Sequence, residues 1–509
     1  MKTIHHLQSF TYLIVFLILI GNISMQAQNK NLGIFDGITD IGSPQIKGTV
    51  LYNAQYQQYL VTSSGENMWF ATDQFNFLWK EMKGDFILTA QIEFVGEGKE
   101  LHRKLGWMVR NSLDSNAAHL NISIHGDGLT SIQYRKATAE NTDELRMDAN
   151  MPNIIQIERK GQDYIVSVAK YGEEFVSQSI HAEYLNNEVF VGLFVCAHNT
   201  NNIEQAKFSN VRIVVPAKDD LVQYQQYLGS HLEIMDIETG NRVIHFSAQN
   251  SIQAPNWATD GKSLIYNSDG LLYDFEIKKG LPKVINSDFA NKNNNDHVLS
   301  FDGKMLGISH HSSTDDSKSI IYIMPAKGGI PKRVTANGPS YLHGWSPDKK
   351  DLIFTGERNG QYDIYKIDIE TGIETRLTDA NGLDDGSEYT PDGKYIYFNS
   401  NRTGTMQIWR MKPDGSNQEQ ITFDVLNNWF PHISPDMQWI VFISFPKEVP
   451  SGDHPFYKRV YLRMIPFAGG EPKVIAYLYG GQGTINVPSW SPDSKRIAFV
   501  SNTGMEVKK

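Results

Sequence analysis

Residues 387–400 read SEYTPDGKYIYFNS, and this stretch decides the fold because variants of it recur along the C-terminal half of the chain. Within it, Pro391 fixes a backbone φ angle, and Asp392 and Gly393 accept the geometry of a tight turn. An aromatic residue precedes the turn, and the run YIYFNS that follows alternates as a β-strand does. The unit therefore predicts two antiparallel strands joined by a turn.

Five further copies place the same turn at a regular spacing. They are PNWATDGKSLIYNS (255–268), HVLSFDGKMLGISH (297–310), HGWSPDKKDLIFTG (343–356), PHISPDMQWIVFIS (431–444) and PSWSPDSKRIAFVS (488–501). The aspartates of the six copies lie 42, 46, 44, 44 and 57 residues apart: Asp260, Asp302, Asp348, Asp392, Asp436 and Asp493. This period matches a four-stranded propeller blade. We therefore expect an all-β protein with a six-bladed β-propeller over residues 231–509.

The two ends of the repeat region predict how the propeller closes. The sixth copy runs out at Lys509 after two strands, whereas residues 232–246 (LEIMDIETGNRVIHF) look like the last two strands of a unit that lacks its first two. Strands from both ends of the region would then form one blade, and no edge strand would stay open. The spacing of 57 residues marks an insertion at residues 446–458, in the fifth blade.

Residues 30–215 predict a second domain, which has no repeat. Short alternating segments are separated by polar turns, such as residues 86–95 (FILTAQIEFV), 119–126 (HLNISIHG) and 188–198 (EVFVGLFVCAH). Seven or more such strands are typical of a β-sandwich. Residues 216–230 are the predicted linker. Cleavage near Pro216 is expected to release a propeller that unfolds cooperatively by itself.

The N-terminus predicts an exported protein. Residues 1–27 contain Lys2, an apolar run at residues 13–20 that is too short to span a bilayer, and Ala27 as a small residue for cleavage, as in a secretory signal peptide. No later stretch is long and apolar enough to be transmembrane, and Cys196, the single cysteine, cannot form an intramolecular disulfide. We expect a soluble monomer in the periplasm or outside the cell.

The charge of the chain excludes one class of partner. Its net charge is −10 and its pI is near 5.8, so the sequence offers no clustered basic surface for nucleic acid.

The repeats resemble the TolB-like β-propellers, in which this proline–aspartate turn follows an aromatic residue in each blade. The resemblance implies the six-bladed fold and a place among envelope scaffolds, peptidases and lyases. It assigns no binding residue, because the motif recurs in every blade.

The N-terminal domain resembles concanavalin A-like jelly rolls, in particular a family of unknown function. The matching segments are residues 84–86 (GDF), residues 106–110 (GWMVR), residues 191–195 (VGLFV) and the positions Ala206, Phe208, Asn210, Val211 and Ile213. Because such domains accompany carbohydrate-active modules, the resemblance implies glycan binding.

The channel mouth is the predicted ligand site of the propeller. The chain contains no nucleophile elbow, HExxH motif, phosphate-binding loop or CxxC pair. Polar residues just before each inner strand and at the end of the second strand are instead expected to ring one mouth of the central channel. These candidate ligand-binding residues are His297, His310, His311, His343, Glu357, Arg358, Glu388, Arg402 and His432.

His297, His343 and His432 are also candidate metal ligands. The first two lie five residues before the aspartate of their repeat, and His432 is one position off. Histidines together with a carboxylate can bind a transition metal. Oligogalacturonate lyase propellers, which this blade type resembles more loosely, use channel histidines in that way. Two alternatives stay open: a divalent ion such as zinc, manganese or calcium, or a polar rim without a cofactor.

Aromatic residues of the sandwich are candidates for carbohydrate binding, because sugars present apolar faces to aromatic rings. Trp69 and Trp79 are the candidate carbohydrate-binding residues. Trp107 lies in an apolar run that is typical of a core strand. Asp73 and Asp127 are candidates to hold a structural calcium ion together with loop carbonyls, although a turn role suits Asp127, between two glycines, better.

The absence of a catalytic motif favours recognition over catalysis. The leading expectation is an extracytoplasmic protein that binds a glycan or an envelope protein through the propeller and a lectin-like sandwich. The alternative is a glycan-degrading lyase or hydrolase with a metal-assisted site at the channel mouth.

Overall fold

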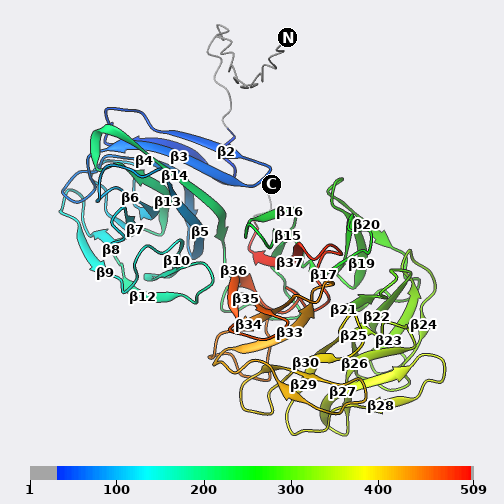
Figure 1. The fold of residues 1–509 in the computed structure, drawn as a ribbon. Coiled ribbons are helices and arrows are strands. Elements are labelled where there is room, and N and C mark those ends of the chain that lie inside the picture. The colour runs from blue at the N-terminus through cyan, green and yellow to red at the C-terminus, as the bar shows by residue number, and fades with distance from the viewer. Residues whose placement is uncertain (1–30, 506–509) are drawn as a thin grey trace, which may run out of the picture.

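The computed structural model describes residues 31–505, and every regular element in that range is a β-strand. The predicted signal segment, residues 1–27, lies outside the described residues. Figure 1 shows an N-terminal pair of sheets beside a ring of blades. No helix in residues 31–505 is both long and apolar enough to cross a membrane.

The N-terminal domain consists of two seven-stranded antiparallel sheets. The first contains, in spatial order, β1 (Gly37–Ile41), β4 (Phe75–Lys83), β13 (Glu188–Cys196), β6 (Lys104–Arg110), β7 (His119–His125), β8 (Thr130–Arg135) and β9 (Asp143–Arg146). The second contains β12 (Val176–His181), β11 (Asp163–Ala169), β10 (Ile154–Lys160), β5 (Phe86–Val95), β14 (Asn199–Val214), β3 (Gln58–Gly65) and β2 (Thr49–Asn53).

One hydrophobic core joins the two sheets. Alternate residues of each strand point into it, as strand geometry requires, and they include Trp107 of the first sheet and Phe208 of the second, both fully buried. The two sheets therefore pack face to face as a sandwich. Its assignment as a concanavalin A-like jelly roll stays a prediction.

The C-terminal domain is a six-bladed propeller. Five blades are complete four-stranded antiparallel sheets. Blade one contains β17 (Gln253–Trp257), β18 (Ser263–Ser268), β19 (Leu271–Glu276) and β20 (Leu281–Ile285). Blade two contains β21 (Asn293–Leu299), β22 (Met305–His311), β23 (Ser319–Pro325) and β24 (Lys332–Arg333). Blade three contains β25 (Ser340–Trp345), β26 (Asp351–Arg358), β27 (Gln361–Asp368) and β28 (Glu374–Arg376). Blade four contains β29 (Asp384–Tyr389), β30 (Ile396–Ser400), β31 (Gln407–Met411) and β32 (Glu419–Gln420). Blade five contains β33 (Asn427–Ile433), β34 (Trp439–Phe445), β35 (Lys458–Pro466) and β36 (Lys473–Gly480).

The aspartate of each repeat holds the turn between the first two strands of its blade. In blade three, Asp348 Oδ1 accepts a hydrogen bond from the Ser346 hydroxyl (2.7 Å) and another from the Lys350 N–H (3.2 Å). Blade four repeats both bonds with Thr390, Asp392 and Lys394. A short polar side chain that bonds backbone two residues on is a standard way to stabilise a turn. The repeat is thus explained by local turn chemistry.

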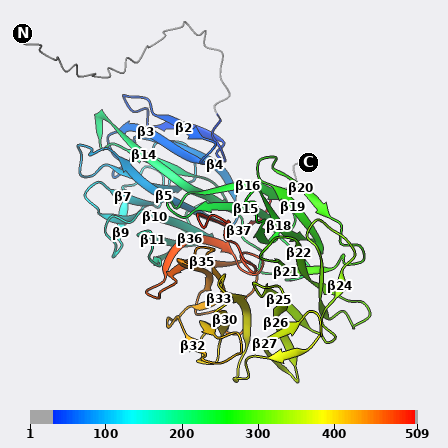
Figure 2. The same cartoon turned by 45° about the vertical axis from the view of Figure 1, so that its right-hand side comes forward.

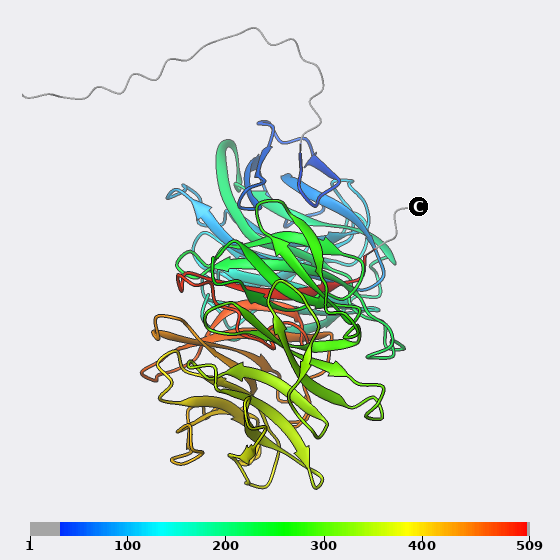
Figure 3. The same ribbon diagram turned by 90° about the vertical axis from the view of Figure 1, so that its right-hand side faces the viewer.

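The sixth blade combines strands from both ends of the propeller region. β15 (Gly229–Asp236) pairs with β16 (Arg242–Ala248) on one side and with β37 (Arg496–Thr503) on the other. A single bridge from Trp490 to Ile497 stands where an inner strand would be expected. In Figure 3 the red C-terminal strand crosses among the green strands, which places the two ends of the region in one sheet.

The sandwich lies against the sixth blade (Figure 2), and a buried charge cluster joins the two. Arg212 of β14 lies 2.6 Å from Glu233 of β15, and Arg242 of β16 lies 2.9 Å from the same carboxylate. The Asn210 side chain also bonds the Gly240 carbonyl and the Arg242 N–H. Because these groups are buried and mutually paired, the two domains make a specific contact and are not merely tethered.

The linker also lies against the propeller. The Ala217 N–H donates to the Tyr479 hydroxyl (2.9 Å), and the Leu228 N–H donates to the Tyr457 hydroxyl (2.9 Å). Further along, Tyr224 packs edge-on against Phe456, with 5.2 Å between ring centroids. The linker thus meets the insertion of blade five.

Candidate functional site

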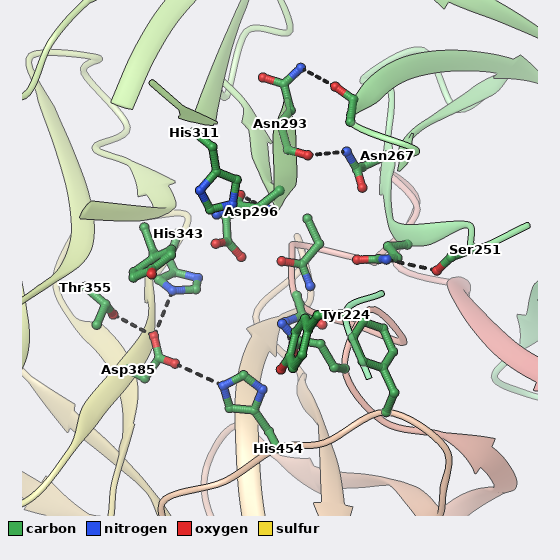
Figure 4. Close-up of a pocket in the computed structure, with 18 of the residues that line it drawn as sticks. Tyr224, Ser251, Asn267, Asn293, Asp296, His311, His343, Thr355, Asp385 and His454 are labelled. Carbon is green, nitrogen blue, oxygen red and sulfur yellow. Dashed lines mark hydrogen bonds and ion pairs between the residues drawn. The ribbon is translucent and has the colours of Figure 1, made fainter. Parts of the chain in front are cut away.

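A cavity of about 970 Å³ occupies the end of the propeller channel at which the inner strands begin. Its residues come from these strands, from the linker and from the blade-five insertion, and Figure 4 shows them facing a common space. The aromatic members are Tyr224, Tyr227, Tyr341, Tyr362, Phe430 and Phe456. The amide members are Gln253, Asn267, Asn291, Asn293, Asn294, Asn295, Gln482 and Asn486. The titratable members besides tyrosine are Asp269, Lys292, Asp296, His311, His343, Asp385 and His454.

Breaks in strand register position several of these side chains. Each of the five inner strands β17, β21, β25, β29 and β33 contains a bulge or irregularity against its neighbour. In blade two, Asn294, Asn295 and Asp296 have no paired residue on the neighbouring strand. In blade three, the same is true of His343. A bulge changes the direction of side chains that a regular ladder would place on the faces of the sheet. Here these unpaired residues line the cavity.

Asp385 is the most heavily contacted carboxylate of the cavity. It accepts hydrogen bonds from the Thr355 hydroxyl (2.6 Å) and from the Gly386 N–H (2.8 Å). His343 Nε2 lies 2.9 Å from one of its oxygens, and His454 Nε2 lies 3.9 Å from the other. These contacts, drawn in part in Figure 4, join blades three and four to the insertion of blade five.

The contacts of this pair shift the pKa values of both partners. Burial alone would raise the pKa of Asp385, but the His343 ring and the Thr355 hydroxyl hold that pKa down at about 2. Burial alone would lower the pKa of His343, but Asp385, together with Asp296 and Glu388, raises it above the ordinary value. The pair is therefore an imidazolium and a carboxylate at mildly acidic pH.

Asp296 differs from Asp385. Its side chain lines the same cavity, the residue is 5% exposed, and neither carboxylate oxygen has a hydrogen-bond partner within residues 31–505. Burial raises the pKa of Asp296, the His343 charge opposes this rise and the Asp385 charge adds to it, so that the pKa lies at about 7. The cavity thus contains two carboxyl groups in contrasting environments.

A second charge pair lies deeper in the channel. His432 Nδ1 lies 2.6 Å from Glu388 Oε2, and the other ring nitrogen donates to the Ile485 carbonyl (2.6 Å). Glu388 also lines a cavity of about 320 Å³ at the opposite end of the inner strands, where Trp345 and Tyr389 form part of the wall. The two cavities therefore lie at opposite ends of the channel.

The structure distributes the nine predicted mouth residues over several places. His311 and His343 line the large cavity, and Glu388 and His432 form the deeper pair. The other five predicted residues lie outside the large cavity and the deeper pair. His297 donates to the Ile265 carbonyl, and His310 packs against Phe289 and Tyr322. Glu357 accepts from the Gly360 N–H, Arg358 pairs with Glu374, and Arg402 pairs with Asp384.

The three predicted metal ligands have separate surroundings. The unpaired residues of blade two end at Asp296. His297, the next residue, is therefore paired with Ile308 in the regular ladder. Burial lowers its pKa to about 4. His343 and His432 each pair with a different carboxylate. Within residues 31–505 no group of three or more His, Cys, Asp or Glu side chains is arranged to hold a metal ion.

The two predicted tryptophans of the sandwich have different surroundings. Trp79 packs edge-on against Phe190 at 5.2 Å and donates to the Thr39 hydroxyl. Trp69 is half-buried, and neither tryptophan lines the cavities of about 970, 630 and 320 Å³. Asp73, considered as a calcium ligand, is instead fully buried and lies 2.7 Å from Arg135.

Sequence reasoning missed Asp296, Asp385 and His454. One signal was present, because the insertion at residues 446–458 was recognised from the spacing and contains His454. A second signal was the acidic residue near the start of two inner strands, at Asp296 and Asp385. The bulge that turns Asp296 inward has no comparable signal in the sequence.

Comparison with known proteins places the propeller among relatives. The family model of the TolB beta propeller domain matches residues 343–451. Tol-Pal system protein TolB of Francisella tularensis subsp. tularensis is 28% identical over 270 residues, which are 51% of this chain and 59% of that protein. This chain thus spans less than two thirds of that TolB.

Two relatives from Agrobacterium are more similar. An uncharacterized protein of Agrobacterium fabrum is 44% identical over 272 residues, which cover 53% of this chain and 92% of the relative. The solved structure described as "putative TolB from Agrobacterium tumefaciens" is 43% identical, with a TM-score of 0.53, and the match covers 55% of this chain and all of that one. Through its propeller, the chain belongs to the family of TolB-like β-propeller proteins.

Proposed function

We propose that this protein is an exported binding protein whose propeller cavity receives the end of a glycan. The observation that carries this proposal is the composition of the cavity, which combines aromatic rings, side-chain amides and carboxylates around about 970 Å³. Sugars offer an apolar ring face and several hydroxyl groups, so they suit rings and amides placed side by side.

The shape of the site favours a chain end over a flat protein surface. Small-ligand sites are concave and hold a few polar groups in fixed positions, and the cavity reaches inward to Asp385 and Asp296. The TolB relatives belong by name to the Tol-Pal system, so an envelope protein is the competing occupant. Residues 1–27 support export, and the sandwich would add a second recognition surface.

A second candidate function is glycan hydrolysis. It is favoured by the two cavity carboxyl groups, because a pKa near 7 at Asp296 and near 2 at Asp385 suits a proton donor and an ionised partner. The metal-assisted form of this candidate draws no support from the separate positions of His297, His343 and His432.

A binding and product-release screen tests these candidates. Calorimetry with a panel of oligosaccharides is expected to find a ligand whose affinity falls roughly tenfold in Tyr362→Ala, which removes a half-exposed cavity ring. The matched control is Tyr56→Ala, an exposed ring of the sandwich that is expected to bind normally. Reproducible release of shorter sugars would favour hydrolysis, and absence of binding across the panel would contradict both candidates.

A further inference from the structure

Asp296 lacks the partners that the other cavity carboxylates have. Asp385 accepts from Thr355 and Gly386 and pairs with His343. Asp269 accepts from the Asn250 side chain at 2.7 Å. No described side chain or N–H bonds either Asp296 oxygen. A buried carboxylate without a hydrogen bond is costly, so such a group in a cavity is expected to have an external partner.

The groups that face Asp296 define what this partner can be. The charge of His343 on β25 acts on Asp296 and lowers its pKa, but His343 is already paired with Asp385 on β29. Tyr341 is a neighbour, and burial together with the nearby carboxylates raises its pKa well above the ordinary value, so its hydroxyl is neutral. Lys292, His311 and His454 also line the cavity, and Figure 4 shows His311 beside Asp296. The vacant contact at Asp296 therefore suits a hydrogen-bond donor or a cation.

Two further features favour a cation. The chain has a net charge of −10, which raises the local concentration of positive ligands. The cavity walls contain six aromatic rings, among them Tyr341 and Phe430, and ring faces attract ammonium groups. A neutral hydroxyl would be attracted by the carboxylate alone, whereas an ammonium group would be attracted both by the carboxylate and by the faces of the aromatic rings.

We propose that the cavity selects a glycan bearing a primary ammonium group, as a 2-amino sugar does, and that this group binds to Asp296. The inference rests on the proposed glycan-binding function and adds the chemical class of the ligand. It predicts discrimination at one substituent of the sugar: a free amine is accepted, whereas an N-acetyl group offers no charge to the carboxylate.

Three matched tetrasaccharides provide the test. The β-1,4-linked tetramers of glucosamine, N-acetylglucosamine and glucose differ only at carbon 2, and their affinities can be compared by calorimetry at pH 7. The glucosamine tetramer is expected to bind at least about tenfold more tightly than either of the other two tetramers, which is the effect of one hydrogen bond to a charged group. Asp296→Asn is expected to abolish this preference, whereas Asp148→Asn, an exposed aspartate of the sandwich, keeps it.

The remaining outcomes separate the two proposals. Equal binding of the three tetramers, or a preference that persists in Asp296→Asn, contradicts the ammonium site but leaves glycan binding in place. Failure of these tetramers and of the wider panel removes the glycan function itself. Tetralysine that competes through Asp296 as strongly as the glucosamine tetramer would assign the ammonium site to a protein partner and contradict the glycan assignment.

Discussion

His343 of blade three lies 2.9 Å from Asp385 of blade four, so a largely buried ion pair joins two blades at the wall of the cavity. Removing one partner of such a pair leaves the other charge buried without compensation. We therefore expect His343→Gln to lower the free energy of unfolding by about 3 kcal/mol at pH 5.5. Denaturant unfolding measures this difference, and His181→Gln, at an exposed histidine, is the control.

The effect of His343→Gln should depend on pH. The folded-state pKa of His343 is raised, so its contribution is complete below the unfolded value near 6.5 and is lost as the pH rises through the folded value. The pKa of Asp385 is lowered to about 2, so its contribution is lost as the pH falls from about 4 toward 2. The stability gap should be widest between about pH 4.5 and 6.5. A gap that stays constant up to pH 9 would contradict the assignment.

The repeats allowed the propeller to be predicted because their information is local. Asp348 bonds residues two positions away on either side, so the turn depends only on its own short segment. The six copies then require a ring of blades. The sandwich could be predicted only as a class, because alternation indicates strands but does not specify which strands pair.

The cavity could be predicted only in part, because strand register decides which residues face it. His297 and His343 hold the same position relative to the repeat aspartate, yet one belongs to a regular ladder and the other to a bulge. A shift of one residue moves a side chain to the other face of a strand. Asp385 and His454 meet only because separate blades come together, which no local pattern encodes.

The contact between the domains should be sensitive to Glu233. Burial alone would raise the pKa of this carboxyl, but Arg212 and Arg242 hold it well below its ordinary range. Glu233→Gln would leave two arginines buried without their counter-charge, and we expect a loss of about 3–5 kcal/mol in thermal unfolding. Glu238→Gln, at an exposed site in the same hairpin, is expected to change little. Equal melting temperatures for the two variants would contradict the role of the cluster.

Cleavage of the linker should not separate the domains. The sequence favours independent halves, but the structure joins them through Arg212, Glu233 and Arg242 and through the Tyr477 hydroxyl, which donates to the Glu173 carbonyl at 2.6 Å. After limited proteolysis near Pro216, we expect two bands under denaturing conditions and one peak in native size-exclusion chromatography. Two native peaks would instead support separable domains.

Ring closure should depend on β37. A chain that ends at Lys495 lacks this strand, so β15 loses its partner from Gly229 to Asp236 and presents an unpaired edge. We expect such a chain to aggregate or to lose cooperative unfolding, as scattering and calorimetry would show. A truncated chain that is monomeric and as heat-stable as the longer one would contradict this mode of closure.

The pairing of β15 with β37 also sets an order of events during synthesis. Residues of the sandwich and the first blades emerge early and can begin to fold while translation continues. β15 emerges before the first complete blade, but one of its two partners is not made until residues 496–503. Glu233 lies on β15. The Ser501 hydroxyl on β37 also donates to the Glu233 carboxylate, so the Glu233 cluster and the ring that shapes the cavity reach their final form only after residues 496–503 have been made, and a ribosome stalled before them would hold a chain with an open ring.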